Sequence, residues 1–124
     1  DVVLVVPQRN DSRLVGLASR AYYEPLLKAG VRILEYRDGL LHAKTMTVDR
    51  ELAMVTSANL DRRSFDLNFE AGLLIYDSDF SSNLRFLQNE YMSASDAVDP
   101  GLWMNRPSHV RIAQNAAGLL APLL

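Results

Sequence analysis

The chain has 124 residues, of which 48% are hydrophobic and 23% charged, with a net charge of −2 and no cysteine. These values predict a single globular domain over residues 1–124, and they exclude disulfides and thiolate metal sites. Interspersed acidic and basic residues disfavour a general nucleic-acid-binding protein, which usually shows a basic face. No apolar run approaches the roughly 20 residues that cross a bilayer. Because the sequence starts at Asp1 inside an apolar run, we expect it to be a fragment of a larger chain.

The first third of the sequence predicts a strand, a helical region and a second strand. The valine-rich run Val2–Val6 is typical of a buried central strand. A helical period extends from about Arg13 to Ala29, where Pro25 breaks or kinks the helix unless it opens a second short one. Residues 31–36 form the next predicted strand, and this order implies a right-handed parallel crossover.

The remainder predicts a hairpin, a further strand and two helices. Leu41–Val48 and Leu52–Val55 are the two strands of the hairpin, and Phe69–Tyr76 reads as an interior strand because it is apolar on both faces. The following helix carries one apolar stripe, and after a predicted loop over residues 97–106 a last helix starts near Pro107. We therefore predict an α/β fold with a mixed or mostly parallel sheet flanked by helices.

Several polar side chains in the hairpin region have spacings that suit a common site. His42 and Lys44 alternate along the first strand, so an imidazole and an ammonium would share one face and could hold and attack an anion. The second strand leads into Ser57 and Asn59, which an antiparallel return would place level with the first pair. Asp49 lies near the turn, at the far end of the first strand.

These residue types suit attack on a phosphodiester, which needs positive charge, hydrogen-bond donors, a nucleophile and an acid for the leaving oxygen. Lys44 supplies the charge and Ser57 and Asn59 supply donors, so these three residues are the predicted phosphate-binding groups. His42 can act as nucleophile or as general acid. Asp49 lies roughly 16 Å of strand from Lys44 and is expected to fix the turn or pair with a nearby base.

The spacing matches the phospholipase D superfamily signature His-x-Lys-x4-Asp-x6-Gly-Ser-x-Asn at every fixed position except the glycine, where this chain has Thr56. The flanking sequence resembles the cardiolipin synthase branch through residues 59–64, residues 67–70, Trp103, Arg106–Pro107 and the ending 121–124. The resemblance implies a phospholipase D-like fold and the C-terminal catalytic half of a bacterial cardiolipin synthase. An acid downstream of the signature orients the histidine in family members, which makes Glu70 the candidate for His42.

The implied reaction is phosphatidyl transfer between two phosphatidylglycerol molecules through a phosphohistidine, with no cofactor and no metal. Two such motifs meet in the family, so the implied partners are a second His-Lys-Asp half, upstream or on a second subunit, and a phospholipid. In tandem members the first motif supplies the nucleophile, which makes His42 the general acid. His109, the other histidine, has no lysine two residues on and is not favoured as the partner. The resemblance implies a parent protein at the bacterial cytoplasmic membrane and a soluble fragment.

Two other interpretations of the sequence remain open. A dimeric phospholipase D-like nuclease or phosphodiesterase would use the same groups, although the net charge and the start at Asp1 disfavour it. Alternatively, the isolated chain is a folded half-module that is inactive alone, because half of a two-histidine site should not turn over. Transfer and hydrolysis both remain compatible with the motif.

Overall fold

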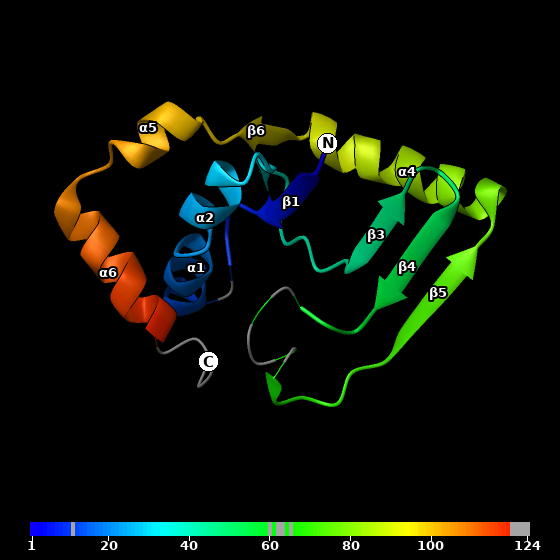
Figure 1. Cartoon of the computed structure of the whole chain (residues 1–124), viewed down its shortest axis with the longest axis horizontal. Coiled ribbons are helices and arrows are strands. Elements are labelled where there is room, and N and C mark those ends of the chain that lie inside the picture. Colours follow the sequence, from blue (N-terminus) through cyan, green and yellow to red (C-terminus); the bar gives the residue numbers. More distant parts are fainter. Residues whose placement is uncertain (11, 60, 62–63, 65, 120–124) are drawn as a thin grey trace.

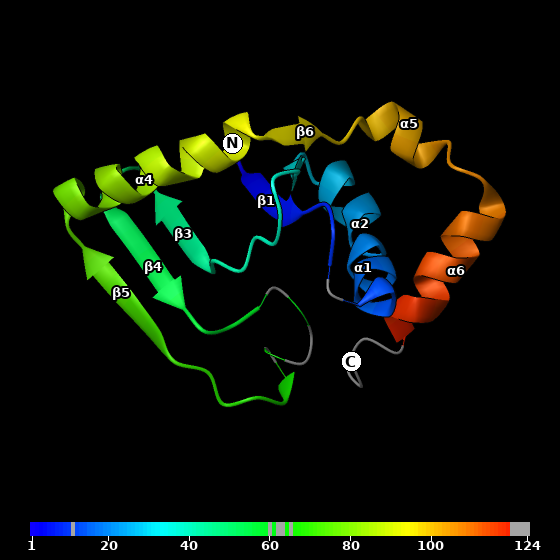
Figure 2. The same cartoon turned by 180° about the vertical axis from the view of Figure 1, so that it is seen from behind.

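The computed structural model describes residues 1–10, 12–59, 61, 64 and 66–119. The described part contains two small three-stranded sheets flanked by helices (Figures 1 and 2). One strand pair, β1 with β2, is parallel, and the other described pairs are antiparallel. The predicted α/β class with mixed strand directions is confirmed, but the strands form two separate sheets instead of one.

The first sheet has the order β1-β2-β6, with β2 (Arg32–Tyr36) between β1 (Val3–Pro7) and β6 (Ser95–Ala97). The prediction that the valine-rich strand is central is therefore wrong within the described sheet, where β1 is an edge strand. The predicted parallel crossover is confirmed and contains two helices, α1 (Arg13–Arg20) and α2 (Tyr23–Lys28). Pro25 is tolerated in α2 because it occupies the first turn, where a backbone N–H has no helical partner.

The core of this half lies between β2 and the helices. Ile33 in β2 is 1% exposed and clusters with Tyr23 and Leu27 of α2. Trp103 lies against Tyr23 with the ring centroids 4.9 Å apart. It belongs to α5 (Pro100–Met104), so the prediction of an unbroken loop over residues 97–106 is wrong. Helix α6 (Ser108–Leu119) packs on α1 through small residues that allow close approach, Ala18 and Ala117.

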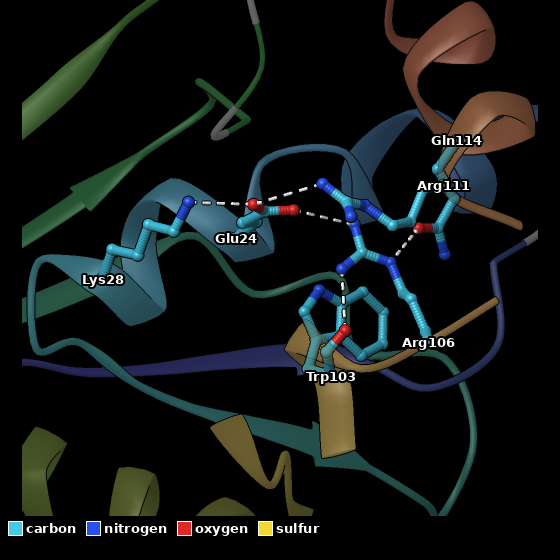
Figure 3. A network of polar contacts seen from close by, with 6 residues as sticks. All are labelled: Glu24, Lys28, Trp103, Arg106, Arg111 and Gln114. Carbon is cyan, nitrogen blue, oxygen red and sulfur yellow. Dashed lines mark hydrogen bonds and ion pairs between the residues drawn. The ribbon is translucent and has the colours of Figure 1, made fainter. Parts of the chain in front are cut away.

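A charged network holds α2, α5 and α6 together (Figure 3). The largely buried guanidinium of Arg106 donates to Gln114 Oε1 at 2.9 Å, to the Trp103 carbonyl at 2.8 Å and to Glu24 Oε2 at 3.3 Å. Glu24 also pairs with Lys28 and Arg111. The hydrogen bond from Lys28 is the largest of the effects that lower the pKa of Glu24. Three cations therefore converge on one carboxylate.

The second sheet is an antiparallel meander of β3 (Thr45–Val48), β4 (Leu52–Thr56) and β5 (Gly72–Tyr76). Helix α4 (Ser78–Ser93) lies across one face of this sheet (Figure 1). Its Gln88 side chain accepts a hydrogen bond from Thr47 Oγ1 at 2.7 Å and donates to Thr45 Oγ1 at 3.2 Å. Ala53, in the same cross-strand row as Thr47, is fully buried beneath the helix.

The opposite face of this sheet has no covering layer within the described residues. It carries the cross-strand row Met46, Met54 and Leu74, and Leu74 is 56% exposed. The prediction that Phe69–Tyr76 forms an interior strand is therefore wrong for the described chain. Strand β5 is an edge strand, and its apolar residues on this face contact no second layer formed by described residues.

Candidate functional site

The hairpin places Lys44 at the open end of the second sheet. The Thr56 N–H donates to the Lys44 carbonyl at 3.0 Å, so the β3–β4 ladder continues one residue before β3. The predicted strand from residue 41 is too long, because regular strand geometry begins only at Thr45. The Lys44 ammonium turns back and donates to the His42 carbonyl at 2.9 Å. The His42 side chain is exposed and has no hydrogen bond or ion pair with the described residues.

At the start of the β4–β5 loop, Ser57 is hydrogen-bonded to Ala71 and Glu70. The Ser57 N–H donates to the Ala71 carbonyl at 2.9 Å, and the Ala71 N–H donates to Ser57 Oγ at 3.0 Å. The Ser57 hydroxyl in turn donates to Glu70 Oε2. Its proton is thus engaged by a carboxylate in this structure. The expectation that Ser57 donates to phosphate stays a prediction, and it requires this bond to be exchanged.

Thr56 occupies the position at which the superfamily signature has glycine, and its hydroxyl makes two hydrogen bonds at the end of β4. It donates to the Ala71 carbonyl at 3.1 Å and accepts from the Ala58 N–H at 3.1 Å. The residue opposite is Gly72, where a Cβ would lie 3.3 Å from Thr56 Oγ1. The missing glycine at one position is therefore matched by a glycine across the ladder.

Glu70 is held as a carboxylate beside a cation. Hydrogen bonds from Ser57, first, and then from Ser64 and Asn68 lower its pKa, and the positive charge of Lys44 lowers it further. The structure therefore brings together Lys44, Ser57 and Glu70 of the predicted site. The contacts of Glu70 with described residues do not include the predicted one to His42.

Asn59 is tied to a residue that sequence reasoning did not select. Its N–H donates to the hydroxyl of Ser64 at 3.0 Å, and Ser64 is 6% exposed. The Ser64 N–H donates to Asp61 Oδ1 at 2.8 Å. The segment 59–64 supported the family resemblance, but a serine five residues after an asparagine carries no chemical signal of its own. Only the folded loop shows that its hydroxyl accepts the Asn59 N–H.

Asp49 lies at the other end of the hairpin from Lys44. Asp49 and Arg50 have φ angles of 50° and 60°, and the Glu51 N–H donates to the Val48 carbonyl at 3.1 Å. Two consecutive positive φ values identify a type I′ turn, in which aspartate is well tolerated. Asp49 therefore lies in the turn, and its expected role, fixing the turn or pairing with a nearby base, stays a prediction.

The part of the chain that the structure describes contains neither a metal cluster nor a membrane-spanning helix. No cluster of three or more histidine, aspartate or glutamate side chains is arranged to hold a metal ion there. The helices of that part are also too short or too polar to cross a membrane.

Comparison with known proteins identifies the family. Residues 1–89 match the model of the family described as cardiolipin synthase, PLD-like domain. The chain is 48% identical to cardiolipin synthase A of Klebsiella pneumoniae and 46% identical to that of Escherichia coli, in each case over all 124 residues. It spans about a quarter, 26%, of the length of these relatives. No solved structure matches the chain. The chain therefore belongs to the family of cardiolipin synthase, PLD-like domains.

Proposed function

We propose that this chain supplies one of two His-Lys-Asp half-sites for phosphatidyl transfer, which makes cardiolipin from two phosphatidylglycerol molecules. The observation that carries the proposal is the Lys44–Glu70–Ser57 cluster at the open end of the second sheet, two residues from the exposed His42. Family membership supports it, since the relatives bear the name cardiolipin synthase A. In this proposal the chain is the C-terminal catalytic half of a longer enzyme.

The reaction has two displacements at one phosphorus. An imidazole nitrogen of the partner half's histidine attacks the phosphorus of phosphatidylglycerol, which forms an N–P bond and breaks the P–O bond to glycerol. His42 gives its proton to the departing glycerol oxygen. It then takes the proton from a hydroxyl of the second phosphatidylglycerol, whose oxygen attacks phosphorus and displaces the first histidine as cardiolipin forms.

The remaining residues stabilise charge and orientation. Lys44 offsets the negative charge on the nonbridging oxygens, and the exposed Asn59 amide donates to them. Glu70 accepts the second ring N–H of His42, as a carboxylate does for a catalytic histidine. When Glu70 turns to His42, the Ser57 hydroxyl is released from its present bond and becomes free to donate to phosphate.

The partners follow from the same chemistry. The second half-site must face the open end of the sheet, and Lys44 lies two residues before Met46, on the face that lacks a second layer among the described residues. The substrate is a phospholipid, so the complete enzyme works at the bacterial cytoplasmic membrane. The isolated chain is expected to be inactive.

The test replaces the matching quarter of the Escherichia coli enzyme by this chain and measures cardiolipin and released glycerol from phosphatidylglycerol vesicles. His42→Gln and Lys44→Met should each lower transfer by at least about 100-fold. His109→Gln is the matched control, since His109 is an exposed histidine of α6, and it should retain activity.

Two results would change the proposal. A hybrid enzyme that forms no cardiolipin, together with an isolated chain that dimerises and cleaves DNA, would favour the nuclease instead. A trapped phosphoryl adduct on His42 would keep the reaction but reverse the roles of the two histidines.

A further inference from the structure

We propose that Thr56 is a positioning residue of this site, whose hydroxyl fixes the segment that carries Ser57 against the segment that carries Glu70. The proposal rests on the proposed function, because positioning matters only if Ser57 and Glu70 serve the reaction. It gives a specific task to the residue that occupies the glycine position of the superfamily signature, where the signature itself supplies no side chain.

The hydrogen bonds of the Thr56 hydroxyl are the first observation. The hydroxyl donates to the Ala71 carbonyl at 3.1 Å and accepts from the Ala58 N–H at 3.1 Å, so its proton and a lone pair are both used. Ala58 directly follows Ser57, and Ala71 directly follows Glu70. One side chain therefore holds the backbone next to both polar residues, at the point where the pairing of β4 with β5 ends.

The second observation is that the strand pairing does not itself need this hydroxyl. The Ser57 N–H already donates to the Ala71 carbonyl at 2.9 Å, so the backbone alone continues the ladder past Thr56. The hydroxyl adds the bond to the Ala58 N–H, which lies beyond that ladder. A glycine at position 56 could make neither of the two side-chain bonds. The added contacts therefore act on the loop residues after the strand and not on the strand itself.

The residue opposite Thr56 supplies the third observation. Gly72 pairs with Thr56 across the ladder, and a Cβ at Gly72 would lie 3.3 Å from Thr56 Oγ1 and 3.4 Å from Thr56 Cβ. Gly72 does not have a positive φ, so its backbone conformation does not require glycine. The lack of a side chain at position 72 therefore leaves room for the threonine hydroxyl, and we expect the two residues to depend on each other.

The same threonine also connects Ser57 and Glu70 to Lys44. The Thr56 N–H donates to the Lys44 carbonyl at 3.0 Å, while Ser57 Oγ donates to Glu70 and accepts from the Ala71 N–H. Without the bonds of the Thr56 hydroxyl, the backbone after Ser57 would be less restrained, and the Ser57 hydroxyl would spend less time within reach of Glu70. Misplacement by about 1 Å costs an enzyme about 100-fold in rate. Thr56 should therefore affect the rate of transfer more than the binding of substrate.

The chain offers a matched control in Thr47 of β3. Its hydroxyl donates to Gln88 of α4 at 2.7 Å, so it belongs to the same sheet but makes its hydrogen bond to the covering helix. Thr47→Val and Thr56→Val both remove a threonine hydroxyl and keep the β-branched shape of the side chain. A difference between them isolates the effect of the Thr56 contacts from the effect of losing a threonine hydrogen bond in this sheet.

The first measurement uses the 124-residue chain and follows amide hydrogen exchange at Ala58 and Ala71 by NMR. Thr56→Val should speed exchange at both amides about tenfold, because Ala58 loses its acceptor and the Ser57 hydroxyl that accepts from Ala71 is no longer held in place. Thr56→Ser should restore slow exchange, and Thr47→Val should leave both amides unchanged. Exchange that stays slow at Ala71 would show that the hydroxyl only caps the strand end, and it would overturn the proposal.

Gly72→Ala displaces the same hydroxyl without removing it, and it decides the question if Thr56→Val does not fold. In the chain that retains Thr56, Gly72→Ala should speed exchange at both amides, because the new Cβ crowds Thr56 Oγ1. In a chain that carries Thr56→Gly, Gly72→Ala should cause no further change. Equal effects in the two backgrounds would show that Gly72 and Thr56 are independent, and would count against the proposal.

The second measurement uses the hybrid enzyme in which this chain replaces the matching quarter of the Escherichia coli protein. Thr56→Val should lower kcat about tenfold with little change in KM, Thr56→Ser should restore kcat, and Thr47→Val should leave it unchanged. A lower melting temperature with an unchanged kcat would overturn the positioning role. Failure of the unsubstituted hybrid to make cardiolipin would instead count against the proposed function, and the exchange rates would still decide whether Thr56 holds the two segments together.

Discussion

The two sheets of this molecule differ in how their side chains are used. Around β1-β2-β6, helices bury Ile33, and the three cations of the Arg106 network pair with one carboxylate. Around β3-β4-β5, one helix covers one face, the other face exposes Leu74, and Lys44, Ser57 and Glu70 gather at an open end. Most of the buried apolar contact lies in the first half, and the chemistry lies in the second.

This difference has a physical cause. Side chains that must meet a substrate or a second half-site cannot also be enclosed by their own domain, so the site-bearing sheet is left less covered. In the first half Lys28, Arg106 and Arg111 converge on the Glu24 carboxylate, whereas His42 has no partner among the described residues. We therefore expect stability to be set mainly in the first half and activity in the second.

The largest expected effect comes from the same type of truncation made in each sheet. Ile33→Ala should lower the free energy of unfolding by about 3 kcal/mol, because Ile33 is 1% exposed and a cavity would remain. Leu74→Ala should lower it by less than about 1 kcal/mol, because the side chain is already largely in water. Urea unfolding of both variants measures the difference.

If Ile33→Ala prevents folding, Ile33→Val keeps the comparison, with an expected loss of about 1 kcal/mol. Equal losses for the variants in the two sheets would show that the uncovered face is protected in solution, and the contrast between the halves would not hold.

A smaller effect concerns acid stability in the first half. The folded-state pKa of Glu24 lies below its ordinary value of 4.5, with Lys28 as the largest cause. As the pH falls, the Glu24 carboxylate is therefore protonated in the unfolded chain before it is protonated in the folded chain. The stability that Glu24 contributes is present above about pH 4.5 and is lost below it. Glu24→Gln should flatten the fall in stability below pH 5 that urea unfolding measures at a series of pH values. An unchanged slope would show that the network contributes nothing at neutral pH.

Sequence reasoning reached the fold class and the family for identifiable reasons, and the reacting residues stay a prediction. The type and spacing of His42, Lys44 and Ser57 are local properties, and the ladder between β3 and β4 follows from two short apolar runs around a polar turn. The parallel crossover followed from a strand, helices and a strand in that order. Each of these inferences needed only neighbours in the sequence.

The wrong predictions depended on contacts between distant segments. Apolar residues on both faces of β5 suggested an interior strand, but its exposure is set by its edge position in the sheet and by the lack of a second layer among the described residues. The hydrogen bond between Asn59 and Ser64 depends on how the loop after β4 folds, which no sequence periodicity indicates. The helix α5 was missed because Pro100 and Gly101 look like a turn, although proline is well suited to a first helical turn.

The smallest expected effect separates the hairpin turn from the site it supports. Arg50 has a φ of 60° in a type I′ turn, where glycine is favoured after aspartate. Arg50→Gly should therefore raise the free energy of unfolding by about 0.5 kcal/mol, because relief of the left-handed conformation exceeds the entropy lost by glycine. Gly39→Ala should lower the free energy of unfolding, because Gly39 has a φ of 120°, which alanine rarely adopts.

In the hybrid enzyme, Arg50→Gly should leave cardiolipin formation unchanged, because the turn lies at the end of β3 away from Lys44. A loss of activity without a loss of stability would mean that the turn also sets the position of Lys44 through the β3–β4 ladder. The second half would then depend for its chemistry on backbone geometry along the whole hairpin, and not on its open end alone.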